Sequence, residues 1–159
     1  MIIDKNQAVI DYLMTCPYIQ ANLMFFNFID AKDNSKQFVT TANDVAINTS
    51  YIDGSVMRRY TFTIIDYKSI AYNALVNMTG YVDENVEDML EVQTIINWVT
   101  AQEEIHNYPN FGSDYFIEKI KALSDNPNLN GIDTSVKPTL AKYSVSIQID
   151  YLDTSKQIQ

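Results

Sequence analysis

The residues whose chemistry could support a reaction are few in this chain of 159 residues. His106 is the only histidine and lies near Glu103 and Glu104. An imidazole and two carboxylates could together ligate a metal ion. Adjacent residues of a helix point about 100° apart, however, so the two glutamates would not converge on one ion. We therefore favour a solvent-exposed helix end, with His106 near the negative end of the helix dipole, and predict no metal site.

A catalytic nucleophile is also poorly supported. Cys16 is the only cysteine, precedes Pro17 and has no histidine near it in the sequence. Such a residue is more often a small buried apolar group than a reactive thiol. The glycine-rich phosphate-binding motifs, the serine-hydrolase elbow and the zinc-protease helix motif are absent, and Asp30, Asp33 and Asn34 lack the glycine and glutamate of a calcium loop. We predict that the chain is not an enzyme and has no cofactor.

Composition restricts the class of partner. The chain has a formal net charge of −9, is 47% hydrophobic, and contains four glycines and four prolines, which predicts one globular domain over residues 1–159. The negative charge argues against tight nonspecific binding of nucleic acid, although an acidic surface would let DNA slide past. No run of about 18 apolar residues predicts a membrane span, and no signal peptide is recognisable. The eleven tyrosines suit surfaces that become buried on assembly.

Apolar periodicity predicts the elements that would position these residues. Segments with helical periodicity are 4–14, 83–104 and 114–123. Segments with the composition or the alternation of strands are 22–29, 37–42 and 142–151. In the segment 83–104 the residues with helical apolar spacing, expected to face the core, are Val86, Met89, Leu90, Ile96 and Val99. In the segment 114–123 the residues expected to point inward are Phe116, Ile117 and Ile120. The polar segments 30–36 and 126–138 are expected to be loops.

The strongest local pattern is a long β-hairpin at residues 44–66. Apolar and polar residues alternate on both sides of Asp53-Gly54, a dipeptide that tolerates the positive φ of a tight hairpin turn. Arg58 and Arg59 lie near the tip, which would extend beyond the core. They could pair with acidic groups across a subunit boundary, or they could be solvated cross-strand charges. These four residues are candidate contacts with a neighbouring subunit or another partner.

The polar segment 30–43 is the second candidate contact. Lys32, Asp33, Asn34 and Lys36 would be exposed there. A loop that becomes ordered only in an assembly would be a typical contact segment.

The order of the elements predicts the fold class. Runs of strands and runs of helices, without regular βαβ alternation, predict an α+β fold. We expect a single domain with an antiparallel or mixed β-sheet, a long β-hairpin, and helices packed on one face. The last strand would complete the sheet with its tyrosine, valine and isoleucine face, leaving its serine, glutamine and aspartate face for solvent or a partner.

Three segments of the chain resemble a known family: NVEDMLEVQTIINWVTAQEEIHNYPNFG, FIEKIKALSDNPNLNGID and KYSVSIQIDYLD. They are similar to the small tail-terminator, or tail-completion, proteins of tailed bacteriophages and phage-like particles, often labelled minor capsid proteins in phages of Gram-positive bacteria. The likeness is carried by the helix with Trp98, the turn at residues 108–112 and the amphipathic last strand. It covers mainly the C-terminal half.

The resemblance implies an α+β subunit that assembles into a ring, commonly a hexamer, on the head-proximal end of the tail tube. Such a ring ends tube polymerisation, binds the tail tube protein and the head–tail connector proteins, and lets DNA pass through its lumen without specific binding. It belongs to the neck of the virion and is assembled in the cytoplasm of the bacterial host.

Two other classes of protein stay open from the sequence. One is a head-side neck protein, such as a stopper or adaptor of the connector. The other is a small soluble ligand-binding domain or enzyme whose site forms only when distant carboxylates meet in the folded chain.

Overall fold

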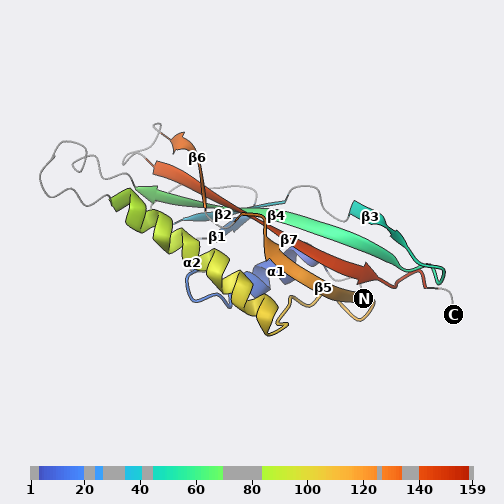
Figure 1. Cartoon of the computed structure of the whole chain (residues 1–159). Coiled ribbons are helices and arrows are strands. Elements are labelled where there is room, and N and C mark those ends of the chain that lie inside the picture. The colour runs from blue at the N-terminus through green and yellow to red at the C-terminus, as the bar shows by residue number, and fades with distance from the viewer. Residues whose placement is uncertain are drawn as a thin grey trace, which may run out of the picture.

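The computed structural model describes residues 4–19, 24–26, 35–40, 45–69, 84–124, 127–133 and 140–157. The elements within these residues are α1 (Lys5–Leu13), β1 (Met24–Phe26), β2 (Lys36–Thr40), β3 (Val45–Ser50), β4 (Val56–Ser69), α2 (Glu84–Glu104), β5 (Tyr115–Ala122), β6 (Asn128–Asp133) and β7 (Leu140–Asp153) (Figure 1).

The sheet is built around two strands of 14 residues, β4 and β7, which pair antiparallel along their whole length. The strand order is β1-β2-β4-β7-β5, with β3 paired to the first part of β4 and β6 to the first part of β7. β1 and β2 are parallel, whereas the other pairs are antiparallel. The predicted α+β class with a mixed sheet is confirmed.

Alternation in the central strands separates the two faces of the sheet. The fully buried residues that these two strands place on one face are Tyr60, Phe62, Ile64, Val145, Ile147, Ile149 and Tyr151. Val9 of α1 and Val99 of α2 belong to the same core cluster, and the rings of Tyr12 and Trp98 join the two helices at 5.1 Å. Both described helices therefore cover this core face, as predicted. We call the opposite face, on which neither of them lies, the helix-free face.

The sequence predicted three of these elements closely. The last strand and the 83–104 helix form as expected, and the carboxylate of Asp4 caps α1 by accepting a hydrogen bond from the Asn6 N–H at 2.9 Å. The prediction that Leu90 faces the core is wrong, because its side chain is 60% exposed. The prediction is confirmed at Ile96 and Val99, which are buried together with Val92 and Ile95.

The segment predicted as a helix at 114–123 is the strand β5. A β-bulge explains the error, because the register with β7 shifts between Ile117 and Lys119. The extra residue places Ile117 and Ile120, three apart, toward the same face of the sheet, and this spacing imitates a helix. Phe116, predicted to point inward, is 55% exposed.

The segment predicted as a loop at 126–138 contains the strand β6. Its pairing with β7 is irregular between Leu129 and Gly131, and Gly131 has φ 136°. Leu129 and Ile132 are exposed, so the strand depends on backbone pairing and lacks the apolar alternation by which strands are recognised.

Several predictions fall partly outside the described residues. β1 confirms the central part of the strand predicted at 22–29, and β2 confirms the first part of the strand predicted at 37–42. The remaining parts lie outside the described residues, as do Lys32, Asp33 and Asn34.

Candidate functional site

The hairpin of β3 and β4 ends in a hydrogen-bonded turn. The Tyr51 N–H donates to the Ser55 carbonyl at 2.9 Å, and the Gly54 N–H donates to the Tyr51 carbonyl at 3.0 Å. The Asp53 carboxylate accepts from the N–H and the hydroxyl of Ser55 at 3.0 and 2.6 Å. Gly54 has φ 90°, a conformation that residues with a Cβ rarely adopt. The turn predicted at Asp53-Gly54 is confirmed.

Replacing Gly54 by alanine is expected to lower the free energy of unfolding by about 1–2 kcal/mol, because the added Cβ is strained at positive φ. Urea denaturation followed by circular dichroism measures this change. The control is Ile52→Ala in the same turn, which should change stability by less than about 0.5 kcal/mol. Equal effects at the two positions would contradict a turn that depends on the glycine.

A second turn of the same kind braces the hairpin from the C-terminal side. Asp153 accepts from the N–H and the hydroxyl of Ser155 at 2.9 and 2.6 Å. Gln157 Nε2 then donates to Asp53 Oδ2 at 2.6 Å. The C-terminal segment is thereby bound to the hairpin turn, and the two lie together in Figure 1.

The carboxylates of the two turns are held in the charged form. Burial raises the pKa of Asp153, but hydrogen bonds from Ser155 and the Arg58 guanidinium outweigh burial, so the pKa lies below its ordinary value. Hydrogen bonds from Ser55 and Gln157 lower the pKa of Asp53. At neutral pH both groups are anions that accept hydrogen bonds and fix the shape of this end of the sheet.

The two arginines near the hairpin end pair with the last strand of their own chain. Arg58 Nε donates to Asp153 Oδ2 at 2.8 Å, and Arg59 donates twice to Asp150, at 2.8 and 3.2 Å. Successive residues of a strand face opposite sides, so Arg58 lies on the core face and Arg59 on the helix-free face. Both arginines therefore form the cross-strand charge pairs that the sequence allowed, with partners on the last strand.

Lys36 is not part of an exposed loop, and this prediction is wrong. It is the first residue of β2 and is buried, with Nζ 3.4 Å from Asp66 Oδ1. Lys68 is buried beside it and binds Glu91 of α2 at 2.7 Å. Lys36 therefore stabilises the interior of the folded subunit and is not available as a surface contact.

These four charged side chains line a cleft of about 310 Å³ together with Pro17, Tyr18, Thr94 and Ile95. Two ammonium groups and two carboxylates balance in charge. Burial raises the pKa of Asp66, while Lys36 and Lys68 oppose this shift. The arrangement joins the sheet to α2 by ion pairs and offers no reactive group.

The turn at the hairpin end is apolar at its most exposed point. Ile52 is 103% exposed, and its neighbour Tyr51 is also exposed. Figure 1 shows that β4 and β7 carry this turn well past the end of α2. Ile52 was not among the residues predicted as contacts, although an isoleucine directly before Asp-Gly in a turn is an unusual signal.

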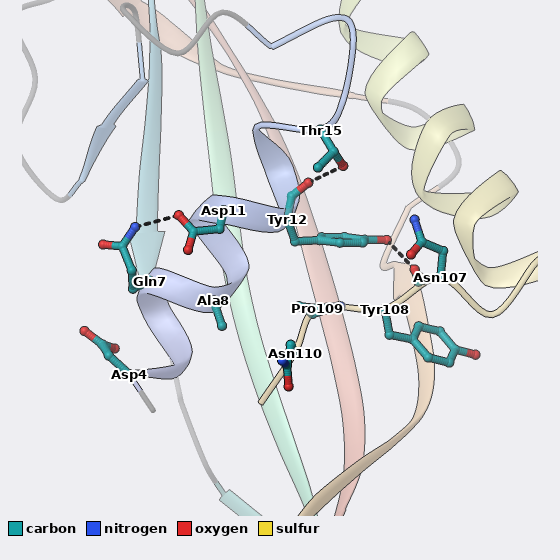
Figure 2. Close-up of a pocket in the computed structure, with 10 residues that line it drawn as sticks. All are labelled: Asp4, Gln7, Ala8, Asp11, Tyr12, Thr15, Asn107, Tyr108, Pro109 and Asn110. Carbon is teal, nitrogen blue, oxygen red and sulfur yellow. Dashed lines mark hydrogen bonds between the residues drawn. The ribbon is translucent and has the colours of Figure 1, made fainter. Parts of the chain in front are cut away.

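A second cleft, of about 540 Å³, lies between α1 and the turn at residues 107–110 (Figure 2). Its polar groups mostly bind one another. Gln7 donates to Asp11 at 2.8 Å, and the Tyr12 hydroxyl points across to donate to the Asn107 carbonyl at 3.0 Å. Burial raises the pKa of Tyr12, so its hydroxyl stays protonated and keeps α1 attached to the turn.

The residues considered for metal or nucleophile chemistry do not converge in the structure. His106 is exposed, and its Nδ1 lies 2.9 Å from the Tyr108 hydroxyl. Glu103 accepts a hydrogen bond from the Ile120 N–H at 2.8 Å. Burial and a hydrogen bond to Glu103 raise the pKa of Tyr108 to about 12. Cys16 is buried, and burial raises the pKa of its thiol. Within the described ranges, no three metal-ligating side chains are grouped.

No protein-family model matches the chain, and no curated protein matches its sequence significantly. In the part of the chain that the structure describes, no helix is long and apolar enough to cross a membrane.

Proposed function

We propose that the chain is a structural subunit of a phage or phage-like tail. It forms a ring on the head-proximal end of the tail tube, ends tube polymerisation and joins the tail to the head connector. The observation that carries this proposal is the hairpin end, where two strands of 14 residues hold a turn whose Ile52 is 103% exposed. We infer that the adjacent exposed side chains of Tyr51 and Ile52 together form an apolar tip that a binding partner buries.

The polar contacts around this turn support a binding surface. Asp53, Arg58 and Asp153 are all hydrogen-bonded within the chain, so they hold the turn in one shape. A binding surface that is already ordered loses little conformational entropy on association. The resemblance of the sequence to tail-terminator proteins supports the same class of protein.

Within this proposal the hairpin end contacts the tail tube protein, and the connector proteins bind elsewhere on the ring. DNA passes through the lumen without specific binding, in agreement with the net charge of −9. The protein is then part of the virion neck, assembled in the cytoplasm of the bacterial host.

The replacement Ile52→Asp is expected to weaken binding to tube ends strongly while leaving the fold intact. Loss of a central apolar contact typically costs about 2 kcal/mol or more in binding, or about 30-fold in affinity. The measurement is negative-stain electron microscopy of the full chain mixed with tail tubes of the same phage. The wild type should cap one end of each tube and stop its elongation.

The matched control is Ile132→Asp, at an exposed isoleucine of β6 away from the hairpin. It should cap tubes like the wild type. A wild-type chain that ignores tube ends but binds portal complexes would replace this proposal by the head-side stopper or adaptor. An Ile52→Asp variant that caps normally would remove the hairpin end from the interface.

A further inference from the structure

Charge is distributed unevenly between two surfaces of the subunit. Among the residues of α2 whose side chains the structure describes, 90–104, three are acidic and none is basic. β5 contains two lysines, Lys119 and Lys121, in a chain whose net charge is −9. The only acid of β5, Glu118, is the extra residue of the bulge, and its charge acts on Tyr108.

Four exposed residues of the β5 segment form a row on the helix-free face, which we call the β5 row: Phe116, Lys119, Lys121 and Leu123. The register places them beside Leu152, Asp150, Gln148 and Ser146 of β7.

The β5 row has apolar ends and a basic centre. Phe116 and Leu123 are seven residues apart, which corresponds to roughly 20 Å along a strand with one bulge. Lys119 and Lys121 form no ion pair with a described residue, and the nearby Asp150 is already bonded to Arg59. The row therefore offers two positive charges between two apolar side chains.

A second set of exposed residues has the opposite charge and the same span. We call it the α2 stripe, and it consists of Leu90, Glu91, Glu104 and Ile105. Leu90 and Ile105 are 60% and 68% exposed. They are fifteen residues apart, which is about 22 Å along a helix and about 60° around its axis. The stripe has apolar ends with a carboxylate beside each of them. Glu91 binds Lys68 at 2.7 Å, whereas Glu104 forms no ion pair with a described residue.

We propose that the α2 stripe of one subunit docks on the β5 row of a second copy of this chain. This contact rests on the proposed ring and identifies the surfaces that join neighbours within it. The apolar ends match in spacing, and the charges between them are opposite in sign. Pairing of either surface with itself would place like charges together, which disfavours a two-fold symmetric dimer.

The positions of the two surfaces are suited to a ring. α2 covers the core face of the sheet and its stripe is exposed, whereas the β5 row lies on the helix-free face. Each subunit can therefore bind one neighbour through each surface. Head-to-tail contacts of this kind generate closed rings or open helices.

Charge reversal tests the contact. Lys119→Glu/Lys121→Glu disables the β5 row, and Glu104→Lys reverses one charge of the α2 stripe. Each variant alone should lose ring assembly, on tubes and in sedimentation at low salt, by about tenfold or more. Circular dichroism and the melting temperature should stay unchanged, because all three residues are exposed.

A 1:1 mixture of the two variants separates this inference from the proposed function. Each pair still has one intact α2 stripe and one intact β5 row, so heterodimers that neither variant forms alone are expected. Rings of the Lys119→Glu/Lys121→Glu variant equal to those of the wild type would overturn the proposed contact but leave the tail-cap function standing. A wild type that forms no ring even on tube ends would overturn both.

Discussion

Replacing Ile147 by aspartate is expected to leave the chain unfolded. Ile147 is fully buried in the middle of β7, between Phe62 of β4 and Ala122 of β5. The substitution removes apolar contacts worth about 2–5 kcal/mol and places an unpaired carboxylate in the core. A domain is stable by only about 5–15 kcal/mol, so the combined cost approaches or exceeds the whole stability. The variant should show no cooperative thermal transition by circular dichroism.

The neighbouring residue provides the control for this prediction. Ser146 lies on the helix-free face, with its hydroxyl 2.9 Å from that of Thr63. Ser146→Asp keeps an acceptor for the Thr63 hydroxyl and should change the free energy of unfolding by less than about 1 kcal/mol. A folded Ile147→Asp variant, or an unfolded Ser146→Asp variant, would mean that the two faces of β7 are assigned wrongly.

The local sequence pattern was sufficient to predict those elements whose apolar periodicity matches the face that they bury in the fold. Along β7 every second residue from Tyr143 to Tyr151 is apolar and buried, and alternation alone predicted this strand. The same holds for α1, with its cap at Asp4, and for the turn at Gly54, where the dipeptide sets the backbone. In these cases residues close together in the sequence are enough to determine the local structure.

Elements that depend on distant partners were predicted less well. β5 was predicted as a helix because its bulge imitates helical spacing, and only the register with β7 resolves this. β6 pairs through its backbone and has no apolar signal. Lys36 looked like a loop residue because its partner Asp66 is thirty positions away in the chain.

The residues of the candidate site divide in the same way, between those determined by local sequence and those determined by distant partners. Asp53 and Gly54 were predicted from their turn chemistry, whereas the partners of Arg58 and Arg59 are on the last strand and were not connected with them. Ile52 was missed because an apolar residue is assigned to the core unless the fold shows that no core is near it.

The second large effect on the free energy of unfolding is expected for Asp66→Ala, which removes one of the buried charges near the start of β2. Asp66 is buried, and its carboxylate lies 3.4 Å from the ammonium group of Lys36. Removing one partner of a buried pair leaves the other charge uncompensated, which costs about 3–5 kcal/mol. Urea denaturation should show this loss. The control Asp150→Ala breaks the more exposed pair with Arg59 and should cost less than about 1 kcal/mol.

Replacing both partners should recover most of that loss. In Lys36→Met/Asp66→Leu no buried charge of the pair remains, and such apolar replacements are often neutral or stabilising by about 1–4 kcal/mol.

Burial raises the pKa of Asp66 above its ordinary value of 3.8, so the folded wild type binds this proton more tightly than the unfolded chain does. The contribution of Asp66 to wild-type stability is therefore greatest below the ordinary pKa and falls as the pH rises through the folded-state pKa. The double variant lacks this dependence and should gain on the wild type as the pH rises above 3.8. A double variant as unstable as Asp66→Ala would show that the pair itself, and not the absence of a stranded charge, stabilises this end of the sheet.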